Sequence, residues 1–135
     1  MKTKFFFCVL FSLGLLACQG PASGSDSMDK KGMVKITIMY PAGEGNSFDM
    51  DYYAEKHMPM VARLLGDSLK LLEIDKGIAG RSPEEPLPYM AIGYLYFDKL
   101  SAYQNSFGPH AEEILNDIPN YTNVQPVVQI SKVVE

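Results

Sequence analysis

The chain has 135 residues, enough for one domain, and its 47% hydrophobic and 21% charged residues are typical of a globular protein. Its formal net charge is −4, and the sequence contains no run of basic residues. Nucleic-acid binding is therefore not expected, because neutralising phosphates requires clustered Lys and Arg. No apolar run reaches the ~20 residues that a membrane-spanning helix needs.

The first 18 residues predict an export signal that ends in a lipidation site. Lys2 and Lys4 form a short positive region before the apolar stretch 5–16, which is the pattern of a secretory signal peptide. The LLAC sequence at 15–18 resembles the bacterial lipobox, whose Cys receives a diacylglycerol group. We expect a signal peptide over 1–17, lipidation at Cys18 and a lipid-anchored protein of the cell envelope, facing the periplasm. The alternative is a buried helix with a chance cysteine.

The predicted processing defines the mature domain. Residues 18–32, rich in Gly, Ser, Pro and Asp, are expected to form a flexible linker after the lipidated Cys, with one domain over 33–135. Loss of Lys2 and Lys4 leaves ten basic against sixteen acidic residues, so the mature charge is −6. With Cys8 removed and Cys18 lipidated, no thiol remains for a disulfide, a metal site or a nucleophile.

The first half of this domain predicts a strand, a helix and a second strand. Residues 34–40 are β-branched and alternate in polarity, which favours a strand, and a turn-rich loop follows at 41–46. Ser47 or Asp49 is expected to cap a helix that runs through Leu65 and ends at Gly66. Residues 69–79 indicate a second strand, followed by a loop with three prolines at 80–88.

The second half repeats the pattern in the order strand, helix, strand. Residues 89–97 predict the third strand, and Asp98 is expected to cap a helix ending near Ile118, before Pro119. Residues 121–134 predict the fourth strand, where Pro126 implies an edge position or a bulge. The order β-α-β-β-α-β predicts an α+β, ferredoxin-like fold: a four-stranded antiparallel sheet with two helices on one face.

The third strand suggests that the sheet face away from the helices is covered by another chain. Its two faces carry alternating sets of residues, and both sets are largely apolar: Met90, Ile92, Tyr94 and Tyr96 on one face, and Ala91, Gly93, Leu95 and Phe97 on the other. An uncovered apolar face invites a partner. We therefore expect a homodimer that joins its sheets into a dimeric α/β barrel. A monomer with an exposed tyrosine face is the alternative.

Three segments carry a resemblance to a known family. Residues 51–61 (DYYAEKHMPMV) look like the first helix of EthD-family proteins, and residues 107–114 (FGPHAEEI) and 117–122 (DIPNYT) look like the second helix of that family and its exit. The resemblance covers roughly 33–134. It implies a dimeric ferredoxin-like barrel, and members of the family are often described as reductases or oxidoreductases, whereas some relatives resemble dehydratases.

The two histidines are the candidate catalytic residues. His57 and His110 each fall on an apolar stripe that recurs every three or four residues along its helix, so both imidazoles are expected to point toward the sheet and to share one pocket. Imidazole is the side chain best suited to proton transfer near pH 7. Tyr53, Phe107 and the space over Gly93 are expected to contact the substrate. The alternative is that both histidines only pack in the core.

A metal site is another possible role for the two histidines. The histidines together with Glu55, Glu112 or Glu113 have the donor types that zinc or iron binds, but these carboxylates fall outside the apolar stripes. The loop at 41–46 lacks the lysine and the glycine spacing of nucleotide-binding motifs. We therefore expect neither a metal nor another cofactor.

Three functions are compatible with these residues. The first is a cofactor-independent enzyme, an oxidoreductase by the family's usual description, acting on a small apolar or aromatic molecule through histidine-mediated proton transfer; a dehydratase or isomerase would use the same groups. The second is a non-catalytic dimer that binds such a ligand in the envelope. The third is a structural dimer whose own side chains fill the pocket, and a cavity between helices and sheet would disfavour it.

Overall fold

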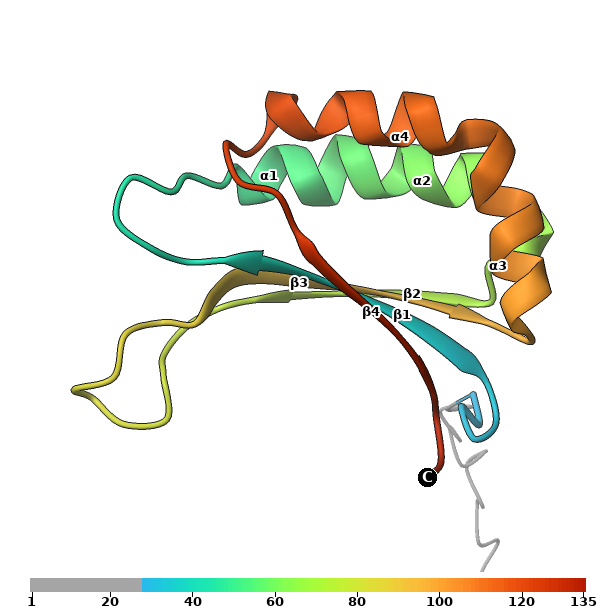
Figure 1. Cartoon of the computed structure of the whole chain (residues 1–135), viewed down its shortest axis with the longest axis horizontal. Coiled ribbons are helices and arrows are strands. Elements are labelled where there is room, and N and C mark those ends of the chain that lie inside the picture. Colours follow the sequence, from blue (N-terminus) through green and yellow to red (C-terminus); the bar gives the residue numbers. More distant parts are fainter. Residues whose placement is uncertain (1–27) are drawn as a thin grey trace, which may run out of the picture.

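A computed structural model describes residues 28–135 of the chain (Figure 1). The predicted signal peptide, Cys18 and most of the linker lie outside the described residues. Among residues 28–135, no helix has the length and apolar character required to cross a membrane.

Four strands and two helical segments follow one another along the chain in the predicted order. The strands are β1 (Val34–Pro41), β2 (Leu71–Lys76), β3 (Tyr89–Phe97) and β4 (Val127–Lys132). The first helical segment comprises α1 (Met50–Tyr52), the π-helix η1 (Tyr53–His57), α2 (Met58–Leu65) and the 3₁₀ turn η2 (Gly66–Ser68). The second comprises α3 (Leu100–Phe107), η3 (Gly108–His110), α4 (Ala111–Asp117) and η4 (Ile118–Asn120).

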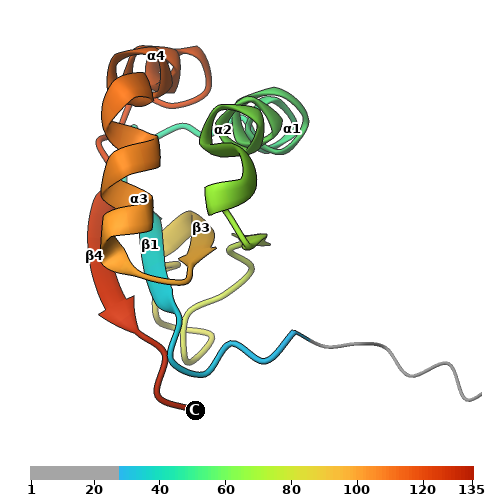
Figure 2. The same cartoon turned by 90° about the vertical axis from the view of Figure 1, so that its right-hand side faces the viewer.

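The strands form one antiparallel sheet in the order β2-β3-β1-β4. Both helical segments lie on the same face of this sheet, as Figures 1 and 2 show from two directions. This arrangement is the ferredoxin-like fold, so the predicted fold class is confirmed. β4 is an edge strand and Pro126 directly precedes it, in agreement with the expected edge position.

The first helical segment contains a local irregularity that brings two aromatic rings inward. Asp49 caps its start by accepting a hydrogen bond from the Tyr52 amide, and Gly66 ends α2 with a positive φ of 55°. Between them, the Met58 amide donates to the Tyr53 carbonyl, five residues back, and Pro59 has no amide hydrogen to continue the usual pattern. Tyr53 and His57, at the two ends of this π-turn, are both buried.

The second helical segment differs from the prediction of one helix capped by Asp98. Lys99 occupies the N-cap position, and no side chain caps the helix there. Pro109 lies in the 3₁₀ turn η3 that separates α3 from α4, and Figure 1 shows the change of direction between these helices. The physical reason is that proline lacks the amide hydrogen needed to continue an α-helix.

The strand ends also differ from the sequence expectation. β2 occupies 71–76 rather than 69–79, and β4 occupies 127–132 rather than 121–134. The amides of Tyr121 and Thr122 donate instead to the Ile118 carbonyl, and Thr122 forms an isolated bridge with Phe48. Residues 121–124 are thereby held against the start of the first helical segment, which positions Tyr121 for the site described next.

The sheet face away from the helices is only partly covered. Gly93 faces the helices, so the alternation of the strand places Ile92 and Tyr94 on the opposite face, where each is half-buried. The Lys30 ammonium lies 4.8 Å from the ring centre of Tyr96 and 2.6 Å from a Glu73 carboxylate oxygen. A mixed face of apolar, aromatic and charged side chains therefore remains on β1, β2 and β3.

Candidate functional site

His57 forms a buried pair with a carboxylate from the other helical segment. The residue is 4% exposed, and its Nδ1 lies 2.8 Å from Oδ2 of Asp117, the last residue of α4. The second oxygen of Asp117 accepts hydrogen bonds from the Tyr52 hydroxyl at 2.9 Å and from the Asn120 amide at 2.8 Å. The carboxylate thus orients His57 and fixes its tautomer, as acidic partners of functional histidines commonly do.

The environment favours a neutral imidazole beside an ionised carboxylate. Burial lowers the pKa of His57, and the hydrogen bond and charge of Asp117 offset this only in part. Burial raises the pKa of Asp117, but the hydrogen bonds from Asn120, His57 and Tyr52 outweigh it, so its pKa lies below the usual range. Near pH 7, His57 therefore carries one proton, on Nδ1, and leaves Nε2 as a proton acceptor.

Two tyrosine hydroxyls continue this hydrogen-bond chain. The Tyr121 hydroxyl lies 3.3 Å from His57 Nε2, and the Tyr40 hydroxyl lies 2.7 Å from that of Tyr121. Burial is the main reason that the pKa of each tyrosine is raised, which keeps both phenols protonated. The connected groups run from Asp117 through His57 and Tyr121 to Tyr40.

Aromatic rings surround this chain of polar groups. The Tyr53 ring stacks on the His57 imidazole, with centroids 5.6 Å apart and an interplanar angle of 15°. Phe48 packs against Tyr40 and Tyr121, with ring centroids 4.8 and 5.4 Å away. These rings help to leave His57 only 4% exposed, and a surrounding of low dielectric strengthens the hydrogen bonds within the cluster.

Tyr53 also fills the space that Gly93 was expected to leave for a ligand. A Cβ at Gly93 would collide with the Tyr53 hydroxyl and approach the Met58 methyl group within 3.1 Å. Of the two occupants that a mid-strand glycine allows, a ligand or an aromatic ring, the structure has the ring of Tyr53, so the space over Gly93 is not open to a substrate. The buried Tyr53 hydroxyl has no hydrogen-bond partner among residues 28–135.

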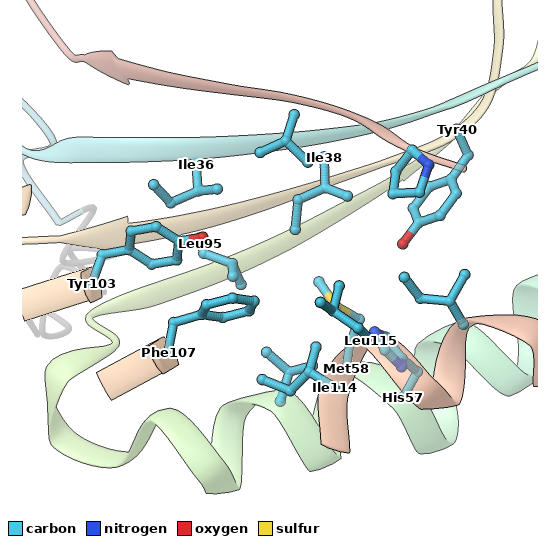
Figure 3. Close-up of a pocket in the computed structure, with 14 residues that line it drawn as sticks. Ile36, Ile38, Tyr40, His57, Met58, Leu95, Tyr103, Phe107, Ile114 and Leu115 are labelled. Atoms are coloured by element: carbon cyan, nitrogen blue, oxygen red, sulfur yellow. The ribbon is translucent and has the colours of Figure 1, made fainter. Parts of the chain in front are cut away.

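A small cavity lies between the helices and the sheet, next to His57 (Figure 3). Its volume is about 70 Å³ and its walls are mostly apolar. Leu115 of α4 and Val128 of β4 line it and are 53% and 51% exposed, so the cavity meets solvent between these two elements. The remaining lining residues are Ile36, Ile38, Tyr40, His57, Met58, Val61, Leu95, Tyr103, Phe107, Ile114, Ile118 and Pro126.

The structure brings together only part of the predicted site. His57 and Phe107 line the cavity, whereas Tyr53 and Gly93 lie in the packing around it. His110 is half-buried in η3 and does not line the cavity, so the expectation that the two imidazoles share one pocket is wrong. The break at Pro109 explains this, because His110 no longer follows the helical periodicity from which its direction was inferred.

Sequence reasoning missed Tyr40, Asp117 and Tyr121 as members of the site. Asp117 and Tyr121 belong to the segment 117–122 that carries the family resemblance, and that short run of polar and aromatic residues was the available signal. Tyr40 offered none beyond its place at the end of the first strand. Across the part of the chain that the structure describes, no three His, Cys, Asp or Glu side chains are grouped as metal ligands would be.

Comparisons with known proteins place this chain in a family. The model of the EthD domain matches residues 43–125. A solved structure of an EthD-like protein from Ralstonia eutropha JMP134 is 40% identical, with a TM-score of 0.74 over 78% of this chain and 95% of that one. An ethyl tert-butyl ether D (EthD) family protein from Bacillus halodurans C-125 is 18% identical, with a TM-score of 0.57 over 74% and 97% of the two chains. No curated protein matches.

The fold and the extent of these matches define the class of protein. The domain is a ferredoxin-like α+β unit with a His–Asp pair at an apolar cavity. The chain belongs to the EthD family.

Proposed function

We propose that this EthD-family chain is an enzyme that acts on a small apolar molecule by proton transfer through His57, with no cofactor. The main observation in support of the proposal is that a neutral imidazole, hydrogen-bonded to Asp117, lines the wall of an apolar cavity. Few polar groups around a mostly apolar space is the usual character of a small-molecule site. A carboxylate-oriented histidine is the usual form of a general base.

The reaction class follows from what these groups do. Moving a proton between two positions of one molecule is sufficient for an isomerisation or a dehydration, and the chain from Tyr40 through Tyr121 to His57 offers a path by which a proton is taken up and returned. The oxidoreductase description used for many relatives needs an electron acceptor in addition. A non-catalytic ligand-binding dimer is the second candidate, favoured by the small size of the cavity.

A copurified ligand tests the proposal directly. Native mass spectrometry of the protein purified from its own cells should show a small-molecule adduct, and His57→Ala should lose it while remaining folded. His110→Ala is the matched control, because His110 does not line the cavity, and should keep the adduct. Retention of the adduct by the His57 variant, or its loss from the His110 variant, would contradict a site centred on His57.

We further propose that the protein works as a homodimer joined through the open sheet face. Ile92 and Tyr94 are half-buried there without a covering layer, and burying such a face typically stabilises association. The same face carries Lys35 beside Glu73 and Asp75, so two copies could pair opposite charges across a twofold axis.

Sedimentation velocity of residues 28–135 at micromolar concentration should give twice the monomer mass. Ile92→Lys places a charge in the proposed interface and should shift the protein to monomer. Ile78→Lys is the matched control, since Ile78 is 93% exposed and lies outside the strands. A wild-type monomer at this concentration would refute the dimer.

A further inference from the structure

Proton positions along the hydrogen-bond chain follow from its carboxylate end. The ionised Asp117 only accepts, so the proton of neutral His57 is on Nδ1 and its Nε2 presents only a lone pair. The Tyr121 hydroxyl must then donate to Nε2, and the Tyr121 oxygen accepts from Tyr40. Each hydroxyl proton in the chain is thereby directed toward His57.

With the protons directed this way, the Tyr40 oxygen can accept a further hydrogen bond, but the Tyr40 hydroxyl has no proton left to donate to another partner. Its one proton is engaged by Tyr121, and a phenol oxygen accepts up to two hydrogen bonds. Tyr40 lines the cavity, and Figure 3 shows its hydroxyl pointing away from the sheet into the space beside His57. A bond from the neighbouring Tyr53 hydroxyl would still leave one lone pair of the Tyr40 oxygen.

The dimensions of the cavity restrict what reaches this oxygen. An apolar cavity of ~150 Å³ encloses one benzene molecule, and this cavity, at about 70 Å³, is about half that size. A space of this size favours insertion of the end of a narrow chain over that of a whole aromatic ring. The exposed Leu115 and Val128 form an apolar mouth over which the remainder of such a chain can lie.

We propose that the cavity binds a narrow, straight-chain apolar molecule whose hydroxyl or enol group donates a hydrogen bond to the Tyr40 oxygen. This inference rests on the proposed function and names its substrate class. It makes Tyr40 the group that touches the ligand, and Tyr121 the link between that contact and His57.

Where the ligand hydroxyl is acidic enough, its proton is transferred through the same contact with Tyr40. The ligand O–H bond breaks as a new O–H bond forms on Tyr40, the former Tyr40 proton passes to Tyr121, and that of Tyr121 passes to His57 Nε2. The net change is one proton moved from an enol ligand to the imidazole, leaving an enolate that accepts a hydrogen bond from Tyr40 and an imidazolium that Asp117 stabilises. Return of the proton to a different ligand atom completes an isomerisation.

The inference is tested by the binding of two probes, 1-hexanol and 1-fluorohexane. The two have nearly equal shapes, but only 1-hexanol donates a hydrogen bond. Methyl NMR shifts of residues lining the cavity report the Kd of each for the folded chain. The wild type should bind the alcohol about fivefold more tightly, the ratio expected of one hydrogen bond. Tyr40→Phe should abolish this preference, while Tyr103→Phe, which removes another hydroxyl from the same cavity wall, should retain it.

The outcomes separate this inference from the proposed function. Equal wild-type affinities, or loss of the preference in the Tyr103 variant alone, would overturn the assignment to Tyr40 and leave His57 untouched. Failure of both probes to bind would overturn the cavity as a ligand site and the proposed function with it. Equal wild-type affinities refute the inference even where the Tyr40 variant folds poorly.

Discussion

Replacing Asp117 with alanine should lower the free energy of unfolding by about 1–3 kcal/mol, the typical cost of leaving a buried donor without a partner. The side chain is 16% exposed and accepts hydrogen bonds from His57, Tyr52 and Asn120, all of which lose their acceptor. Urea unfolding measures the change. Asp98→Ala is the matched control, because that side chain is 66% exposed, and should change stability by less than about 0.5 kcal/mol. Equal effects would contradict a structural role for the pair.

The same variant should change how stability depends on pH. The pKa of His57 in the folded chain is below its ordinary value of 6.5, so between these values the unfolded chain binds more protons and acidification favours unfolding. Stability is therefore fully present above about pH 6.5 and falls toward the lowered pKa, by at most ~1.4 kcal/mol per pH unit. Asp117 is the carboxylate facing His57, and Tyr121 and Tyr53 are the phenols packed on it.

Without the carboxylate, the pKa of His57 should fall further. The loss of stability on acidification should therefore extend to a lower pH in Asp117→Ala than in the wild type. Asp117 itself also contributes to stability. Because its pKa is lowered in the folded chain, this contribution is present above the ordinary value of 3.8 and is lost in more acidic solution. The Asp117→Ala variant should lack it. NMR titration of the His57 ring resolves the shift. An unchanged or raised His57 pKa in the variant would show that Asp117 does not act on the imidazole.

The fold was predictable because its signals are local. β3 has the predicted bounds, and Gly66 ends α2 and Pro126 marks the edge strand as expected, the last two through residues whose backbone preference decides the structure. The departures are also caused by single residues. Pro59 and Pro109 each remove a backbone donor, but the form that results, a π-turn in one segment and a break between α3 and α4 in the other, also depends on how each helix packs on the sheet.

The site was only half predictable, because its polar groups meet through tertiary structure. The periodicity of the first helix correctly placed His57 inside, but Asp117 and Tyr121 are 60 and 64 residues away in sequence. They reach His57 only because the second helical segment lies beside the first and its exit turns back over it. The same periodicity misplaced His110, since it assumed an unbroken helix across Pro109.

The position of this chemistry in the cell depends on Cys18, which lies outside the described residues. Replacing it (Cys18→Ser) should abolish incorporation of labelled fatty acid completely, because an alkyl thioether requires the thiol. The protein should also leave the detergent phase in Triton X-114 partitioning, since acyl chains contribute ~0.8 kcal/mol per buried CH₂.

Cys8→Ser is the matched control: it removes the other cysteine of the chain from within the apolar stretch 5–16 and should leave labelling unchanged. Acyl incorporation that persists in the Cys18 variant would refute the lipobox assignment and the envelope location that rests on it. Loss of labelling in both variants would point to a failure of export, which recovery of the protein in the cytoplasmic fraction distinguishes. Labelling lost only at Cys18 would place the His57 cavity outside the cytoplasm, where a site that needs no soluble reductant retains its chemistry.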